Sequence, residues 1–179
     1  MKLEAASERA PSGLLELLRD LGDGENGFMG TPVPAGRMRL EAYLRQCMEG
    51  TDPARLRPGL VPQTMFWMLD DDGVAVGMVR MRHYLNDKLR AHGGHIGFYV
   101  RRDRRGRGYA RSALRLALAE LAKLGERQAL LTVAADNAPS LRVVEACGGR
   151  FDGEGVDPES GRRLRRYWID LAPPAGNPE

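Results

Sequence analysis

Hydrophobic positions recur at helical spacing in two stretches of the first third of the chain. Leucines fall three and four positions apart across residues 12–21, and apolar side chains do the same across residues 37–49. This period places them on one face of a helix, so both stretches are predicted to be helices. Residues 22–36 are rich in Gly and Pro, and residues 50–62 hold three prolines, so both are expected to be connecting segments.

Strand-like patterns follow in the middle of the chain. Residues 63–69 and 74–82 are mainly apolar, and the Asp-Asp-Asp-Gly at residues 70–73 is typical of a hairpin turn between two strands. Residues 83–94 then form a long connector, with one helical turn expected near its middle. A third apolar run, His-Ile-Gly-Phe-Tyr-Val at residues 95–100, predicts another strand.

The second half of the chain contains two more predicted helices, each of which follows a strand. Leucines and alanines at helical spacing predict a long helix that starts near residue 109 and stops at Gly125. A strand at residues 129–135 and a short helix that ends at Gly148 come next. This mixture indicates an α/β (α+β) fold. The remaining elements are a last strand at residues 164–171 and a tail at residues 173–179 that is expected to be disordered, with residues 1–172 forming one domain.

A glycine-rich turn before the long helix is a candidate phosphate site. The first N–H groups of a helix have no partner inside the helix, and the helix dipole adds partial positive charge there. Glycine lets an anion approach these N–H groups without meeting a side chain. The turn consists of Arg105, Gly106, Arg107, Gly108, Tyr109 and Ala110, and it predicts binding of a phosphorylated cofactor.

The spacing within this turn distinguishes among three kinds of phosphate-binding turn. A P-loop requires Gly-x-x-x-x-Gly-Lys followed by Ser or Thr, and a dinucleotide-binding turn requires a small residue where Arg111 stands. Arg105, Gly108 and Ala110 instead satisfy the pattern Arg/Gln-x-x-Gly-x-Gly/Ala. That pattern resembles motif A of the GNAT superfamily of acyl-CoA-dependent N-acetyltransferases, whose loop amides hold the pyrophosphate of coenzyme A.

The order of motifs around the turn extends the resemblance. Asn137 and Ser140 follow the next strand as in GNAT motif B, and a short helix with a closing Gly comes after them. Gly-Gly-His-Ile-Gly at residues 93–97 and Arg-Arg-Tyr-Trp-Ile at residues 165–169 are similar to stretches of a bacterial GNAT subgroup known mainly as predicted acetyltransferases. The resemblance covers roughly residues 61–172.

This resemblance implies a fold, a reaction and a set of cofactor contacts. The implied fold has a mixed, mostly antiparallel central sheet with a splayed pair of parallel strands, flanked by helices. The implied reaction moves an acetyl group from acetyl-CoA, the cosubstrate, to a primary amine of a small molecule or peptide. The implied cofactor-binding residues are Phe98, Tyr99, Val100, Arg105, Gly106, Arg107, Gly108, Tyr109, Ala110, Asn137 and Ser140.

Two histidines are candidates for the general base. His95 stands where related enzymes often carry a carboxylate, and an ordinary histidine pKa of about 6.5 suits a base at neutral pH. His83 is the other candidate. A histidine at a strand end is also a common structural hydrogen bonder, so both a catalytic and a structural role stay open for His95.

The general acid is also open, because the chain departs from the family pattern. Many GNAT enzymes reprotonate the leaving thiolate with a tyrosine at the position of Val144. Tyr99, Tyr109, Tyr167 or water can serve instead, since a simple thiol has a pKa of only about 8.5. Of these, Tyr99 is assigned together with His95 as a catalytic candidate. The missing tyrosine also keeps open a non-catalytic module that binds or senses acyl-CoA.

Positive charge is concentrated around the turn. Six arginines fall within residues 101–111, although the net charge of the chain is only +3. The pyrophosphate and 3′-phosphate of coenzyme A can occupy such guanidinium groups. A solvated surface and a nucleic-acid patch are the alternatives, but aromatic residues make up only 6% of the chain and none interrupts the arginines before Tyr109, which argues against nucleic acid.

Composition argues against membrane proteins, exported proteins and metal-binding proteins. No apolar run approaches the ~20 residues of a membrane span, and the first ten residues are polar, so a cytoplasmic protein without a membrane partner is expected. Cys47, Cys147 and three histidines predict neither a disulfide framework nor a metal site.

The sequence does not identify the acceptor amine. Carboxylates at Asp70, Asp71, Asp72, Asp87 and Glu49 suit a cationic acceptor such as a polyamine or aminoglycoside, or they are simply solvated. A homodimer is compatible with the resemblance.

Overall fold

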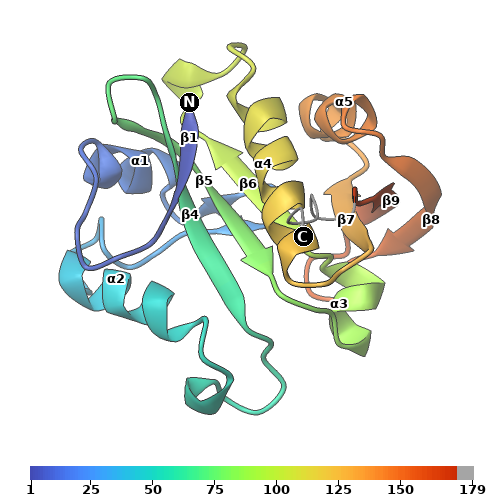
Figure 1. Cartoon of the computed structure of the whole chain (residues 1–179), viewed down its shortest axis with the longest axis horizontal. Coiled ribbons are helices and arrows are strands. Elements are labelled where there is room, and N and C mark those ends of the chain that lie inside the picture. Colours follow the sequence, from blue (N-terminus) through green and yellow to red (C-terminus); the bar gives the residue numbers. More distant parts are fainter. Residues whose placement is uncertain (173–179) are drawn as a thin grey trace, which may run out of the picture.

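Two antiparallel sheets with helices around them make up the computed structural model, which describes residues 1–172 (Figure 1). The expected tail at residues 173–179 lies outside the described residues. The first sheet has the order β1-β4-β5-β6, and the second has the order β7-β9-β8. The strands of these sheets are β1 (Lys2–Ala5), β4 (Gln63–Leu69), β5 (Ala75–Arg82), β6 (Ile96–Val100), β7 (Gln128–Ala134), β8 (Arg150–Val156) and β9 (Arg163–Asp170).

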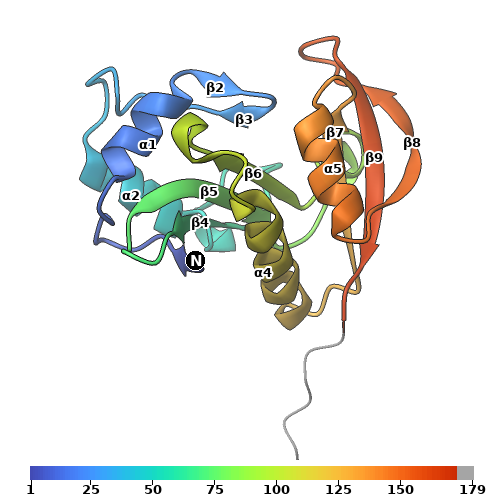
Figure 2. The same cartoon turned by 90° about the horizontal axis from the view of Figure 1, so that it is seen from above.

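Helices cover both faces of the first sheet. Figure 2 shows α1 and α2 on one side of this sheet, α4 beside β6, and the second sheet with α5 beyond it. A small hairpin, β2 (Gly24–Glu25) with β3 (Phe28–Met29), follows α1. The helices are α1 (Leu14–Leu21), α2 (Leu40–Glu49), α3 (Asp87–His92), α4 (Tyr109–Lys123) and α5 (Ala138–Ala146).

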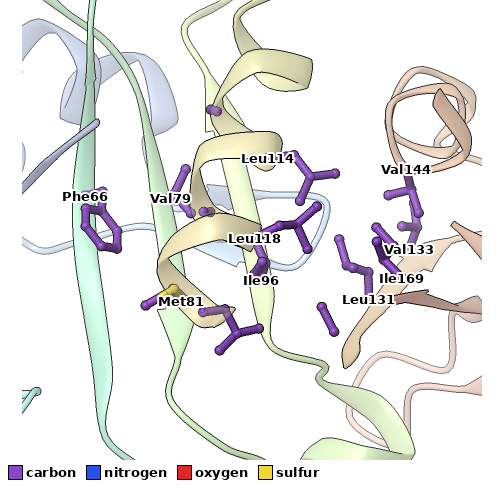
Figure 3. Close-up of a cluster of buried hydrophobic side chains, with 14 of the residues drawn as sticks. Phe66, Val79, Met81, Ile96, Leu114, Leu118, Leu131, Val133, Val144 and Ile169 are labelled. Carbon is purple, nitrogen blue, oxygen red and sulfur yellow. The ribbon is translucent and has the colours of Figure 1, made fainter. Parts of the chain in front are cut away.

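The strands of the first sheet read as continuous apolar runs because both of their faces are buried. Side chains alternate between the two faces of a strand. In β4, Phe66 and Met68 belong to the core under α4, and Met65, Trp67 and Leu69 belong to the core under α1 and α2. The α4 core continues across to Leu131, Val133 and Ile169 of the second sheet and therefore joins the two sheets (Figure 3).

The two sheets also meet through hydrogen bonds beside the start of β6. The His95 N–H donates to the Leu130 carbonyl at 2.7 Å, and the Leu130 N–H donates to His95 Nδ1 at 2.9 Å. An isolated bridge joins Gly94 to Leu131. Beyond these contacts β6 and β7 belong to different sheets. The parallel arrangement expected for this pair stays a prediction.

Most of the expected elements form, with small shifts in their bounds. The sequence did not indicate β1 or β8, and it gave residues 22–36 as a loop although β2 and β3 lie within them. β1 and β8 are edge strands, and β8 is mostly exposed and contains glycines and charged side chains, so neither carries a clear apolar pattern. Within residues 1–172, no helix has both the length and the apolar character that a bilayer crossing requires.

Candidate functional site

A cavity of about 630 Å³ lies between β6, the start of α4, β7 and the start of α5. Its walls combine residues from both sheets, because β6 and β7 separate here. Arg107 and His95 are not among the residues that line it. The sequence-predicted residues that do line it are Phe98, Tyr99, Val100, Arg105, Gly106, Gly108, Tyr109, Ala110, Asn137 and Ser140.

The turn before α4 presents unoccupied main-chain donors to this cavity. A short 3-10 turn over Arg102–Arg104 uses the N–H groups of Arg104 and Arg105, which donate to the carbonyls of Arg101 and Arg102. Among the described residues, no protein acceptor takes the N–H groups of residues 106–111. These groups therefore remain available to a ligand at the positive end of a 15-residue helix.

Two glycines give this turn its shape. Gly106 and Gly108 have φ angles of 77° and 81°, in the left-handed region that other residues adopt at a cost. A Cβ atom added to either would meet nothing within 4 Å, and both residues are exposed. The backbone is thus open to an approaching anion on this side. Gly108 also precedes α4 without a side-chain cap, so no protein group competes for the helix N-terminus.

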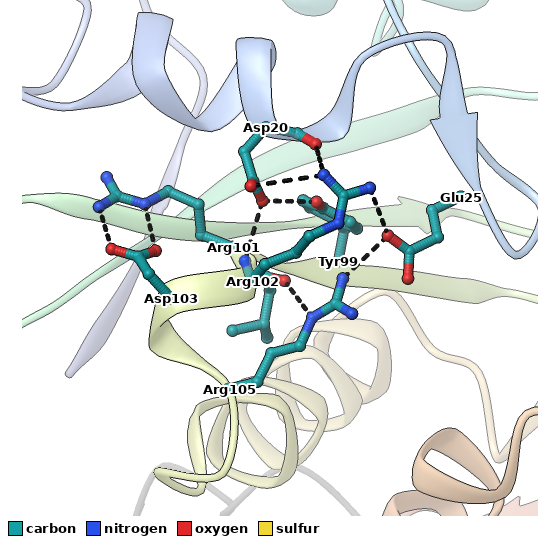
Figure 4. Close-up of polar contacts among 8 residues, drawn as sticks. Asp20, Glu25, Tyr99, Arg101, Arg102, Asp103 and Arg105 are labelled. Atoms are coloured by element: carbon teal, nitrogen blue, oxygen red, sulfur yellow. Dashed lines mark hydrogen bonds and ion pairs between the residues drawn. The ribbon is translucent and has the colours of Figure 1, made fainter.

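Several arginines of the run already have carboxylate partners (Figure 4). Arg101 bonds Asp103 at 2.7 and 2.6 Å. Arg105 donates to Glu25 Oε2 at 3.0 Å and to the Val100 carbonyl at 3.0 Å. The Arg101–Asp103 pair lies within the turn, and the Arg105–Glu25 contact holds the turn against the N-terminal part of the chain. Among the described residues, no carboxylate pairs with Arg107, Arg111 or Arg142, and the last two line the cavity.

Asp20 and Glu25, which we call the acid clamp, hold the turn from the other side. Asp20 Oδ2 accepts the Arg102 N–H at 2.9 Å, and Glu25 Oε2 accepts both Arg102 and Arg105 at 3.0 Å. The hydrogen bond from Arg105 is the main cause that lowers the pKa of Glu25. No sequence motif indicates this clamp, because its members lie about 80 residues from the arginines that they bind.

The Tyr99 hydroxyl is also engaged by the clamp. It donates to Asp20 Oδ2 at 2.6 Å, and the Arg105 guanidinium carbon lies 5.5 Å from the centre of its ring. Burial, reinforced by the hydrogen bond to Asp20, raises the pKa of Tyr99. Its proton is therefore held by a carboxylate. This arrangement suits a side chain that orders the cavity wall.

His95 lies apart from the cavity. Only 3% of this residue is exposed, its Nδ1 accepts the Leu130 N–H, and its Nε2 lies 3.9 Å from Glu126. Burial, together with the positive charges of Arg90 and Arg82, lowers the pKa of His95 to about 4. This geometry gives His95 a structural role between the sheets and gives no support to its assignment as the base. His83, the other candidate, bonds Thr64 through Nε2 at 2.8 Å.

The motif B residues lie at the opposite wall of the cavity. Asn137 caps α5, and its side-chain oxygen accepts the Ser140 N–H at 3.3 Å. Next to them, Arg162 bonds Asp136 at 2.8 and 3.1 Å and Asn26 at 3.3 Å. Arg162 thus connects the β2–β3 hairpin with the turn after β7 at the cavity edge. No sequence motif indicated this connection.

The position of the missing tyrosine is part of the core. Val144 is fully buried on α5. The Tyr167 hydroxyl donates to Glu145 at 3.0 Å, and Tyr167 does not line the cavity. Tyr109 does line it, and among the described residues its hydroxyl has no hydrogen-bond partner.

The carboxylates considered for a cationic acceptor have other partners or positions. Asp70 accepts the N–H groups of Asp72 and Val74 within the hairpin turn. Asp71 bonds the N-terminal amine at 2.6 Å, and Glu49 bonds Arg55 at 3.0 Å. None of them lines the cavity.

Comparison with known proteins identifies the family. The model of the acetyltransferase (GNAT) family matches residues 37–148, which is more than half of the chain. No curated protein matches. Many solved structures match the chain, and three of them are described here.

All three resemble the chain in fold over nearly its whole length. Mutant forms of the spermidine/spermine N-acetyltransferase SpeG from Vibrio cholerae share 18% identity, with 94% of this chain and 93% of that chain covered and a TM-score of 0.63. An N-acetyltransferase from Staphylococcus aureus Mu50 shares 15%, with 96% and 98% covered and a TM-score of 0.65. A candidate acetyltransferase, yncA from Salmonella typhimurium, solved with its cofactor acetyl-CoA, shares 15%, with 99% and 98% covered and a TM-score of 0.63.

The identities are low, so these structures establish the fold, while the family model establishes the relationship. The family match agrees with the order of motifs in the sequence and with the open turn before α4. The chain belongs to the acetyltransferase (GNAT) family, whose enzymes take their acetyl group from acetyl-CoA.

Proposed function

We propose that this protein transfers the acetyl group of acetyl-CoA to a primary amine of a small molecule or peptide, with the cofactor bound in the cavity between β6 and β7. The observation that carries the proposal is the set of free N–H groups at residues 106–111. They lie at the positive end of α4, open to solvent, and they border a cavity that both strands line. Such donors suit a pyrophosphate.

The residues that line the cavity support this placement of the rest of the cofactor. The backbone of Phe98, Tyr99 and Val100 provides strand N–H and carbonyl groups along which the pantetheine arm can extend. Asn137 and Ser140 contact the arm from the other wall. Arg111 and Arg142 supply the unpaired positive charge for the remaining phosphate.

The reaction needs little chemistry from side chains. The neutral amine attacks the thioester carbonyl, the tetrahedral oxyanion takes hydrogen bonds from a main-chain N–H of β6, and the C–S bond breaks to release a thiolate. The amine loses its proton to water, and the thiolate takes one from water or from Tyr109, whose hydroxyl is free among the described residues. A simple thiol has a pKa of about 8.5, so weak acid assistance is sufficient.

A non-catalytic acyl-CoA-binding module is the second candidate. The favouring observation is that Val144 occupies the usual tyrosine position while the hydroxyls of Tyr99 and Tyr167 are bound to carboxylates. Such a protein would keep the cofactor site and lack the transfer reaction.

Release of free thiol from acetyl-CoA in the presence of a panel of amines separates the two candidates. We expect amine-dependent thiol release and an acetylated product by mass spectrometry. Tight binding of acetyl-CoA without amine-dependent release from any member of a broad panel would favour the binding module.

A further inference from the structure

Arg80 carries a positive charge into the protein, and no carboxylate within residues 1–172 forms an ion pair with it. It lies on β5 between Val79 and Met81, which face the α4 core, so its own side chain faces the α1 and α2 layer. There its guanidinium carbon lies 5.3 Å from the centre of the Phe28 ring. Its Nε is buried with no hydrogen-bond partner among the described residues.

A second arginine reinforces the charge at this place. Arg82 lies on the same face of β5, and its Nη1 donates to the carbonyls of Gly93 and Gly94 at 3.3 and 2.7 Å. Burial, together with the charge of Arg80, lowers the pKa of Arg82 to about 10, and burial also lowers the pKa of Arg80. A buried charge without a partner is costly. The cost is recovered when an anion binds.

The unpaired guanidinium lies directly behind the strand that borders the cofactor cavity. Arg80 is opposite Gly97 in the β5–β6 register, and the neighbours of Gly97, Ile96 and Phe98, line the cavity. Gly97 has no side chain, so the surface there consists of backbone. A Cβ atom at Gly97 would lie 3.6 Å from the Phe28 ring and 3.7 Å from Arg80 Nη2. Both Gly97 and Arg80 keep partial solvent exposure.

We propose that Arg80 binds a carboxylate of the acetyl acceptor, so that the acceptor is an amine that also carries a carboxylate, such as an amino acid or a peptide. This inference rests on the proposed function. The planar guanidinium pairs with a carboxylate through two parallel hydrogen bonds, and the Phe28 ring packs beside it. A polyamine, which is the substrate in the name of SpeG, would be repelled by Arg80 and Arg82.

The test uses acceptors that differ only in the carboxylate. Lysine, lysinamide and cadaverine offer the same side-chain amine, and spermidine serves as the polyamine. We expect lysine or a peptide with a free carboxylate to be acetylated with a higher kcat/KM than the matched compounds without it. In Arg80→Gln, we expect the KM for that acceptor to rise about 10- to 100-fold, with the affinity for acetyl-CoA unchanged.

Two controls make the result specific. Arg127→Gln removes the same charge at an exposed position without a side-chain partner among the described residues, and it should leave the KM unchanged. The melting temperature of Arg80→Gln should equal or exceed that of the parent, because the variant removes an uncompensated buried charge. A fall of many degrees would mean that Arg80 is a structural residue and would overturn the inference.

The remaining outcomes separate this inference from the proposed function. Equal or faster acetylation of cadaverine or spermidine, unaffected by Arg80→Gln, overturns the carboxylate site and leaves the transferase intact. Bound acetyl-CoA without transfer to any acceptor contradicts the transferase and, with it, this inference.

Discussion

His95 joins the two sheets with its main chain and its side chain at once. Its N–H and its Nδ1 both bond Leu130, and the ring is enclosed on all sides. The hydrogen bond to Nδ1 requires a neutral ring, because a protonated imidazole has no acceptor. The residue thus contributes to stability in its uncharged form.

We therefore expect His95 to make stability depend on pH. Its folded pKa of about 4 lies below the unfolded value of 6.5, so its contribution is complete above pH 6.5 and declines as the pH falls toward 4. The unfolded chain binds the proton over that interval and the folded chain does not, which corresponds to about 3 kcal/mol. Urea unfolding between pH 4 and 7 measures this loss.

His95→Gln provides the comparison. Glutamine can still accept a hydrogen bond but does not titrate, so the variant should lose much less stability over the same interval. Parallel pH curves for the two proteins would show that His95 does not titrate in this way.

For the arginines at residues 101–111, the sequence indicates the concentration of charge but not the partner of each side chain. The run at residues 101–111 indicated a charged turn, and Arg104, Arg105 and Arg111 of this turn line the cavity. It could not divide the arginines into structural and ligand-facing members, since the partners of Arg102 and Arg105 are Asp20 and Glu25, far away in sequence. Which arginines have a structural partner is decided when α1 and the β2–β3 hairpin pack against the turn and bring Asp20 and Glu25 to it.

At the scale of elements, the separation of β6 from β7 creates the cavity. The strands are held at one end by the contacts of Gly94 and His95 with Leu130 and Leu131, and they enclose the cavity beyond. Gly94 has a φ of 70°, and a Cβ there would lie 2.6 Å from the Leu130 carbonyl oxygen. Only glycine allows the backbones to approach this closely.

Gly94→Ala should consequently destabilise the protein for two reasons, the left-handed backbone angle and the close approach to Leu130. We expect a loss of about 2–4 kcal/mol in the free energy of unfolding, from the left-handed conformation plus the clash with Leu130. Gly161→Ala is the matched control, because Gly161 has a φ of 68° and nothing within 4 Å of its Cβ position. Equal losses in the two variants would mean that the close approach at Gly94 contributes nothing.

The elements were predictable where their apolar pattern is strong. β4, β5, β7 and α4 carry long apolar runs or stripes, and their bounds agree with the sequence to within two residues. β8 alternates exposed and half-exposed side chains at a sheet edge, and its pairing with β9 is visible only in three dimensions. Val144, at the usual tyrosine position, is fully buried. Which other tyrosine could act as the acid depends on which hydroxyl faces the cavity, and the sequence does not show this.

For the whole molecule, three distant parts of the chain combine into one site. The β2–β3 hairpin, the turn at residues 104–111 and the segment from β7 to α5 all contribute to the cavity. The acid clamp and Arg162 connect these parts by ion pairs and hydrogen bonds. Because the core under α4 spans both sheets, the free amides keep a fixed position beside both strands.

The affinity for acetyl-CoA of two leucine variants, measured by titration calorimetry, tests this arrangement most directly. Gly108 and Gly125 have φ angles of 81° and 92°, and a Cβ atom at either would meet nothing within 4 Å, so Gly108→Leu and Gly125→Leu carry similar backbone strain. Only Gly108 borders the cavity. We expect Gly108→Leu to abolish measurable binding and Gly125→Leu to retain the parental affinity. Intact affinity in folded Gly108→Leu would contradict the assignment of these amides to the cofactor.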